Sequence, residues 1–171
     1  MDVLMIVLRL LHVFAGVFWA GAVFINEGFL LPTVRATGPA GGQFMRHLVG
    51  VKKYSTRIAM SGMLVILTGL GMYWRNGSLS NGAFYRSRPG MVLGLGGLSA
   101  IIALIFGLTY ILPAANRLTQ IGNEVQAAGG PPSAEQAGAI AAMQKKMATG
   151  SHVVSGLIAV AVVAMAIGRY V

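Results

Sequence analysis

Few side chains of this sequence can do chemistry in an apolar environment, and His12 is the first of them. It lies in the run Leu11-His12-Val13-Phe14-Ala15-Gly16-Val17-Phe18-Trp19, where its neighbours are apolar. An ionisable group inside a bilayer is costly, so its presence there indicates a function. A neutral imidazole can ligate heme iron when its second nitrogen is oriented by a hydrogen bond. Gly16, one helical turn further on, is expected to leave room for a flat macrocycle. The alternative is a histidine that only bonds a neighbouring helix.

A second group of polar residues is predicted near the far end of the same segment. Glu27, with Asn26 beside it, precedes Pro32 by about a turn and a half of helix. Arg57 and His152 open later apolar segments on the same side, so we expect these polar residues to share one layer. One interpretation is a Glu27–Arg57 salt bridge that only supports packing. The other is a proton relay, or an anchor in which Arg57 binds a cofactor carboxylate bidentately.

His12 and His152 are not expected to share one heme. At about 1.5 Å of rise per helical residue, His12 lies about 30 Å of helix before Pro32. His152 is expected near the membrane edge where Pro32 lies, and therefore far from His12. His47 is expected to face water.

A copper site would use the sulfur atoms of methionine or cysteine as ligands. Met60 and Met63, and likewise Met143 and Met147, have the spacing of one helix face, and thioethers bind Cu(I). Such stripes are also common in cores and on lipid-facing surfaces. The absence of cysteine excludes disulfides and thiolate ligands. No P-loop, nucleophile elbow or carboxylate pair appears, so the sequence decides neither for nor against an enzyme.

The composition places these residues in a membrane. The chain has 171 residues, of which 56% are hydrophobic and 10% are charged, against about 25% charged in a soluble domain. A net charge of +9 would suggest nucleic acid in a soluble protein. Here the basic residues lie between apolar blocks, where they set topology and attract anionic lipid headgroups. The lipid bilayer, and not nucleic acid, is therefore the expected partner.

Four apolar segments are long enough to cross a bilayer, which takes about 20 residues of helix. The sequence predicts an all-α, integral membrane four-helix bundle in one domain, with helices at about 3–31, 44–75, 90–112 and 134–170. Leu31-Pro32 and Leu112-Pro113 are predicted to end or kink their helices.

The connections before the second and fourth helices are predicted to be helical as well. The apolar residues of 44–56 are spaced like a helix face, and Ser133 with Gln136 has the spacing of a capping box. We expect both connections to run without a break into the helices that follow them.

The two halves of the chain could be related helical hairpins. Leu31-Pro32 followed by Arg35 matches Leu112-Pro113 followed by Arg117, and Lys52-Lys53 matches Lys145-Lys146. The alternative is that any four-helix bundle needs basic residues at the same edge. Of the thirteen basic residues, eight lie in the connections that follow the first and third helices or at their boundaries. This bias favours a cytoplasmic location for those loops. We therefore expect a multi-pass protein of a bacterial inner membrane with both termini periplasmic.

The run from Leu11-His12 to Trp19-Ala20-Gly21, followed by Leu31-Pro32, resembles the first helix of the CopD family of copper-resistance membrane proteins and related uncharacterised four-helix families. Arg57 followed by Leu67-Thr68-Gly69 is similar to their second helix. A more distant likeness is to HemJ, a membrane protoporphyrinogen oxidase and b-type heme protein whose first helix carries a similar His and Trp. The second Tyr-His pair of HemJ is missing here, so its activity is not carried over.

The resemblance implies a small membrane protein related to heme b or copper, with His12 as its metal ligand. Together with the polar layer it makes Trp19, Arg57 and His152 further candidates for cofactor contact. Three functions are open: a heme-binding protein associated with redox or electron transfer, a copper-handling protein, and a non-catalytic accessory subunit of a larger membrane complex.

Overall fold

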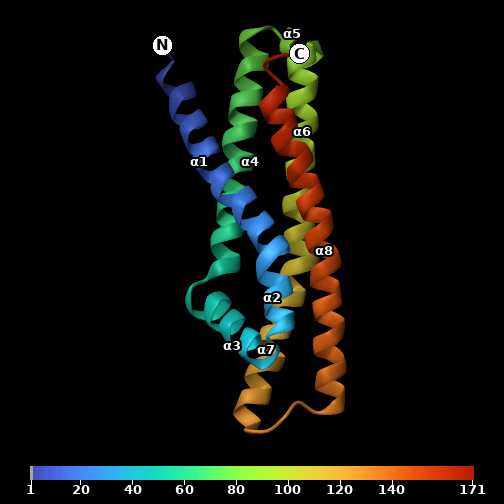
Figure 1. Ribbon diagram of the computed structural model, residues 1–171. Coiled ribbons are helices and arrows are strands. Elements are labelled where there is room, and N and C mark those ends of the chain that lie inside the picture. The colour runs from blue at the N-terminus through green and yellow to red at the C-terminus, as the bar shows by residue number, and fades with distance from the viewer. Residues whose placement is uncertain (1) are drawn as a thin grey trace.

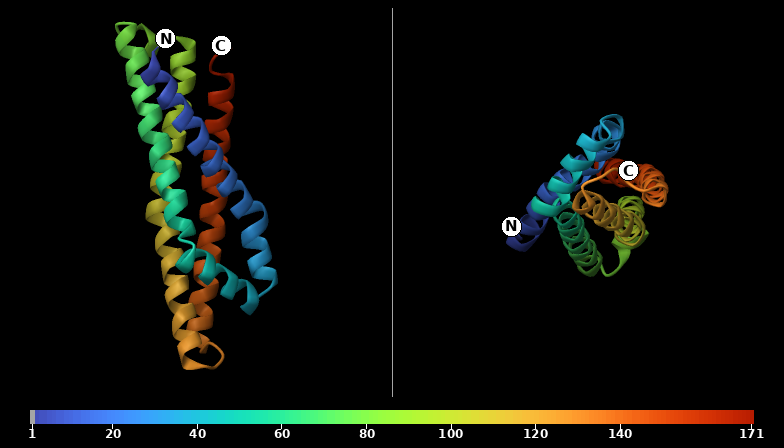
Figure 2. Two further views of the ribbon diagram at one scale, coloured as in Figure 1. Left: turned by 90° about the vertical axis from the view of Figure 1, so that its left-hand side faces the viewer. Right: turned by 90° about the horizontal axis from the view of Figure 1, so that it is seen from below.

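The structure, a computed structural model, describes residues 2–171 and is helical almost throughout (Figure 1). Four helical stretches are long and apolar enough to cross a membrane. Both chain ends lie at one end of the bundle, and the connections α2–α3 and α7–α8 lie at the other (Figures 1 and 2). The predicted all-α bundle with co-facing ends is confirmed.

The first stretch continues through Leu31-Pro32, where the sequence predicted either an end or a kink of the helix. It consists of α1 (Val3–Ile25), the π-helical turn η1 (Asn26–Leu30) and α2 (Leu31–Ala36). A proline inside an α-helix clashes with the carbonyl four residues before it. In η1 the Leu31 N–H bonds the Asn26 carbonyl, five residues back, and this wider turn lets the helix continue through Pro32.

The third stretch repeats this construction. It consists of α6 (Arg88–Phe106), the π-helical turn η3 (Gly107–Ile111) and α7 (Leu112–Ala128). The Leu112 N–H bonds the Gly107 carbonyl, again just before a proline. The helix thus extends well beyond the predicted end at residue 112, and both halves of the chain carry a π-helical turn before a Leu-Pro pair.

The second stretch is broken where a continuous helix was expected. The chain forms α3 (Pro39–Arg46) and the π-helical turn η2 (His47–Val51). It then changes direction, and α4 (Tyr54–Leu79) begins. Lys53 adopts a left-handed conformation with φ of 53°, which no α-helix accommodates. As a result, α3 lies at an angle to α4 across the base of the bundle (Figure 1).

The fourth stretch is one unbroken helix, α8 (Ala134–Ile167), as predicted. Its capping box is present: the Gln136 N–H bonds the Ser133 hydroxyl, and the Ser133 N–H bonds the Gln136 side chain. The short α5 (Ala83–Arg86) connects α4 to α6.

The helices pack as two hairpins, α1 against α4 and α6 against α8, and the hairpins join through α4–α6 and α1–α8 contacts. One apolar core, which includes Trp19, Leu104 and Ile158, fills the centre of the bundle. A smaller one, with Leu31 and Met147, lies near the α2–α7 end. The N-terminal part of α1 lies beside α4 and away from α8 (Figures 1 and 2).

Candidate functional site

His12 lies in the seam between α1 and α4. Its Nδ1 is 3.0 Å from the Val65 carbonyl oxygen and 3.2 Å from the Thr68 hydroxyl oxygen. The Thr68 hydroxyl donates its own proton to the Leu64 carbonyl at 2.6 Å, so both neighbours of Nδ1 act as acceptors. Nδ1 must therefore carry the imidazole proton, which leaves Nε2 unprotonated. Within residues 2–171, Nε2 has no hydrogen-bond partner.

Glycines of α4 make room for the large side chains of α1. A Cβ at Gly69 would lie 2.9 Å from His12 Cε1, and a Cβ at Gly62 would lie 2.9 Å from Trp19 Cε2. Both distances are shorter than a normal contact, so the imidazole and the indole each rest on a bare backbone position. Trp19 is 4% exposed and contributes to the central core, so its place is explained by packing.

Gly16 does not provide the expected space for a macrocycle. A Cβ there would lie 3.9 Å from the Val65 methyl Cγ2. Gly16 therefore faces α4 and brings the two helices close together, as small residues do in membranes. Any cofactor at His12 must lie on the outer side of the seam.

The residues near His12 fit an axial heme ligand in one respect and do not fit it in another. The imidazole has the expected form, with Nδ1–H held by a backbone carbonyl and Nε2 free. However, neither of the two cavities between the hairpins has His12 in its lining. Residues 2–171 also contain no cluster of three or more His, Cys, Asp or Glu side chains suited to a metal ion. A single chain thus offers His12 as one candidate ligand.

Of the four residues predicted to form a polar layer, the structure brings Asn26, Glu27 and His152 into contacts between two helices, but not Arg57. His152 Nδ1 lies 2.5 Å from Glu27 Oε1, and the Asn26 amide donates to the Ser151 hydroxyl at 3.5 Å. Both contacts join η1 to α8. Since Glu27 lies about 22 Å of helix beyond His12, His152 is far from His12, which agrees with the expectation that they share no heme.

The predicted Glu27–Arg57 salt bridge is wrong. Arg57 is exposed on α4 and takes part in neither of the two ion pairs between residues 2 and 171. The reason is rotational: Glu27 on η1 faces α8, whereas Arg57 points away from the bundle. Ser151, which sequence reasoning missed, completes the layer beside His152.

The methionine stripes have structural environments. Met143 and Met147 pack in the smaller core, while Met60 and Met63 are 67% and 45% exposed on the apolar outer face of α4. Neither pair of methionines takes part in the side-chain contacts of His12 or His152. Packing therefore explains Met143 and Met147, whereas Met60 and Met63 lie exposed on an apolar helix, as lipid-facing side chains do.

An ion pair that the sequence did not suggest joins the ends of α1 and α4. Asp2 accepts hydrogen bonds from Met5 N–H at 3.4 Å and from Arg75 Nε at 2.7 Å. The Arg75 guanidinium lowers the pKa of the Asp2 carboxyl below its ordinary value. Asp2 thus caps α1 and ties it to α4 where the first span begins.

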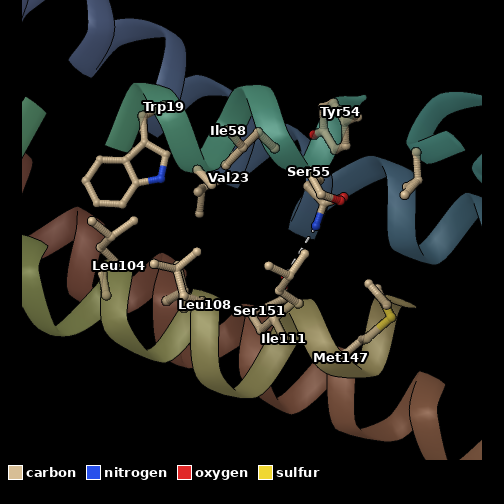
Figure 3. Close-up of a pocket in the computed structure, with 18 of the residues that line it drawn as sticks. Trp19, Val23, Tyr54, Ser55, Ile58, Leu104, Leu108, Ile111, Met147 and Ser151 are labelled. Atoms are coloured by element: carbon tan, nitrogen blue, oxygen red, sulfur yellow. Dashed lines mark hydrogen bonds between the residues drawn. The ribbon is translucent and has the colours of Figure 1, made fainter. Parts of the chain in front are cut away.

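Two adjacent cavities lie between the hairpins. The inner cavity, of about 130 Å³, runs from Trp19 and Leu104 to Ser151 (Figure 3). The basal cavity, of about 760 Å³, lies between the α2–α3 connection and α7–α8. The residues that line both cavities are Met45, Val49, Ala115 and Met147. Sequence reasoning could not find either cavity, because both depend on how α3 folds back across the base.

Comparisons with models of known protein families, with curated proteins and with solved structures give no match to this chain. The function must therefore be argued from the geometry alone.

Proposed function

We propose that this chain is a membrane protein in which His12 supplies an axial ligand to heme b, at a face shared with a second chain. The observation that carries the proposal is the hydrogen bond from His12 Nδ1 to the Val65 carbonyl, which leaves Nε2 free. A histidine that ligates a metal is usually oriented through its other nitrogen in this way. Heme bound there would supply one-electron redox chemistry.

The depth of His12 in the membrane supports a functional role. His12 lies nine residues after Val3, or about 14 Å along α1, which is close to the middle of a hydrocarbon core about 30 Å thick. A hydrogen bond between membrane helices contributes on average only about 0.6 kcal/mol. A polar group without a partner in an apolar medium costs about 2 kcal/mol or more. A purely structural bond would not compensate for an idle Nε2, whereas a metal ligand uses it.

The proposal of a second chain rests on the exposed outer surface of α1 near His12. The N-terminal part of α1 has α4 beside it and is away from α8, so its outer surface is free to meet another protein (Figure 2). The exposed side chains on this part of α1 include Val7, Leu11 and Phe14, which would cover a porphyrin with apolar surface. We propose a second copy of the chain, or a redox subunit, as the source of the other ligand.

An absorption spectrum of the protein purified in mild detergent tests the proposal. We expect a Soret band that is lost in His12→Ala and kept in His47→Ala, since His47 is exposed and makes no hydrogen bond through its side chain among residues 2–171. If the partner is a second copy, the heme content should be about one per two chains. A wild-type protein purified from heme-replete cells without any Soret band would refute the proposal. Metal analysis of the same sample would then show whether copper is bound instead.

We also propose, from the distribution of basic residues, that the protein resides in a bacterial inner membrane with periplasmic termini.

A further inference from the structure

The basal cavity carries positive charge that the protein does not neutralise. Arg35 and Arg46 both line it, and no Asp or Glu lines either cavity. Neither arginine belongs to an ion pair within residues 2–171. Arg35 donates to the Gln144 carbonyl at 3.1 Å. The side chain of Arg46 lies along Gly122, where a Cβ would be 3.1 Å from Arg46 Cδ. Two arginine side chains thus line one cavity, and no Asp or Glu of residues 2–171 pairs with either.

The two cavities change in character from one end to the other. At the deep end, Trp19, Leu104 and Ile58 form an apolar lining (Figure 3). Towards the basal cavity follow Tyr54, Ser55 and Ser151, which carry hydroxyl groups (Figure 3). The arginines lie beyond them in the basal cavity. The order of the linings is therefore apolar, hydroxyl-bearing and cationic.

The order of these linings matches the order of the parts of a membrane lipid, from the apolar tail to the charged headgroup. The 23 residues of α1 span about 34 Å, slightly more than the hydrocarbon core of a bilayer. The η1 turn is thus near one membrane surface, with the inner cavity on its hydrocarbon side. Arg35 and Arg46 follow η1 on the other side, at the depth of lipid headgroups.

We propose that the two cavities together hold one anionic amphiphile that carries a phosphate group. Its phosphate lies between Arg35 and Arg46, its ester or hydroxyl groups meet the hydroxyl-bearing residues, and its apolar chain extends towards Trp19. Guanidinium groups suit phosphate because their planar donors can bind two oxygens at once. The basal volume of about 760 Å³ lies within the range of about 300–1,000 Å³ that is usual for ligand sites.

Lipid binding to the detergent-purified full chain tests this inference by native mass spectrometry. The probes are dioleoyl phosphatidic acid and, as a zwitterionic phospholipid without net charge, dioleoyl phosphatidylcholine. We expect the wild type to prefer the anionic lipid. Arg35→Gln/Arg46→Gln should bind it at least about tenfold more weakly, because it loses both charge-assisted contacts with the phosphate.

A matched control removes the same charge outside the cavities. Arg117 and Lys145 are exposed near the same end and line neither cavity. Arg117→Gln/Lys145→Gln should bind phosphatidic acid within about twofold of the wild type. Equal weakening in both double variants would show attraction to surface charge only and would overturn the inference. Binding of the zwitterionic lipid as tight as that of phosphatidic acid would overturn it as well.

A variant of the inner cavity separates a lipid from a free anion. Gly107 lines the inner cavity, and a Cβ there would meet no atom within 4 Å. Gly107→Leu should fold, shorten the space for the chain and weaken dioleoyl phosphatidic acid, while leaving glycerol 3-phosphate unaffected. If inorganic phosphate or glycerol 3-phosphate binds as tightly as the lipid, the site is an anion site and the amphiphile is refuted.

Failure of the lipid proposal can be told apart from failure of the heme proposal, because the two are measured by lipid binding and by the Soret band. None of these variants touches His12, so the Soret band expected of the wild type should persist in Arg35→Gln/Arg46→Gln. Loss of that band with the arginines, while it is kept in His12→Ala, would place the heme in the basal cavity and not at His12, since His12 is too far from Arg35 and Arg46 for one heme to reach both. That result would overturn both the phospholipid and the role of His12.

Discussion

Two polar side chains of α1, His12 and Asp2, are held by α4 in different ways. The imidazole of His12 uses one nitrogen on the Val65 carbonyl and keeps the other free, whereas Asp2 directs both of its oxygens to protein donors. A residue with all its polar atoms bonded is explained by structure alone. The unequal use of the two imidazole nitrogens is what distinguishes His12 as a candidate ligand.

The Asp2–Arg75 pair predicts a dependence of stability on pH. The pKa of Asp2 in the folded protein is below the ordinary 3.8. The stability from this pair is therefore fully present above that ordinary value and is lost as the pH falls through the folded pKa. Asp2→Asn keeps an N-cap residue but removes the charge. We expect its thermal midpoint in detergent to lie slightly below that of the wild type at about pH 6 and to approach it at about pH 3.

Glu135→Gln provides the control for this experiment. Glu135 is exposed in the first turn of α8 and belongs to neither ion pair that joins residues of the described chain. Its replacement should lower the thermal midpoint at about pH 6 by less than Asp2→Asn does, because it breaks no ion pair. A constant difference between Asp2→Asn and the wild type at every pH would contradict the proposed role of the carboxylate charge.

The elements show which parts of the fold a sequence can reveal. Length and hydropathy were enough for the four spans, and Ser133 with Gln136 was enough for the start of α8. The break at Lys53 was missed because the spacing of Phe44, Leu48 and Val51 is that of a helix, and a left-handed lysine leaves no signal. The Leu-Pro pairs did indicate a disturbance. Sequence could not tell that a π-helical turn absorbs it, because proline fits an ended helix equally well.

The same limit applies to the candidate site. His12 could be singled out by its type and apolar surroundings, but its acceptor on α4 depends on the register of two helices. The partner of Glu27 depends on the rotation of η1, and a π-helical turn shifts that rotation relative to an α-helix. Residue type therefore predicted which side chains matter, while pairing required the packed structure.

The glycine contacts of α4 give a prediction at the scale of the helix pair. Gly62→Ala would place a Cβ 2.9 Å from Trp19 Cε2 and 3.0 Å from Leu104 Cδ1. Overpacking of this kind costs about 1–3 kcal/mol, so the thermal midpoint in detergent should fall. Gly21→Ala is the matched control, since a Cβ at Gly21 meets nothing within 4 Å. There the better helix propensity of alanine should keep or raise stability, by up to about 1 kcal/mol. Equal effects of both changes would show that the α1–α4 seam is not tightly packed at Trp19.

The whole molecule has an uneven charge distribution along its long axis. The end with the basal cavity carries Arg35, Arg46, Lys52 and Lys53 from the first connection alone. The proposed lipid site and the proposed cytoplasmic location of this end depend on the same charges, since basic residues both stay inside and attract anionic lipids. The sidedness of the protein therefore decides which leaflet could supply the amphiphile.

The absence of cysteine makes that sidedness directly measurable. Ser78 near the end of α4 and Ala128 at the end of α7 are both exposed, and they lie at opposite ends of the bundle (Figure 1). In intact cells, a membrane-impermeant maleimide should label Ser78→Cys and should label Ala128→Cys only after the membrane is permeabilised. The reverse pattern would place the basal cavity outside and refute the periplasmic termini. Labelling of both variants in intact cells would contradict the four-span topology itself, because an odd number of spans must separate these two positions.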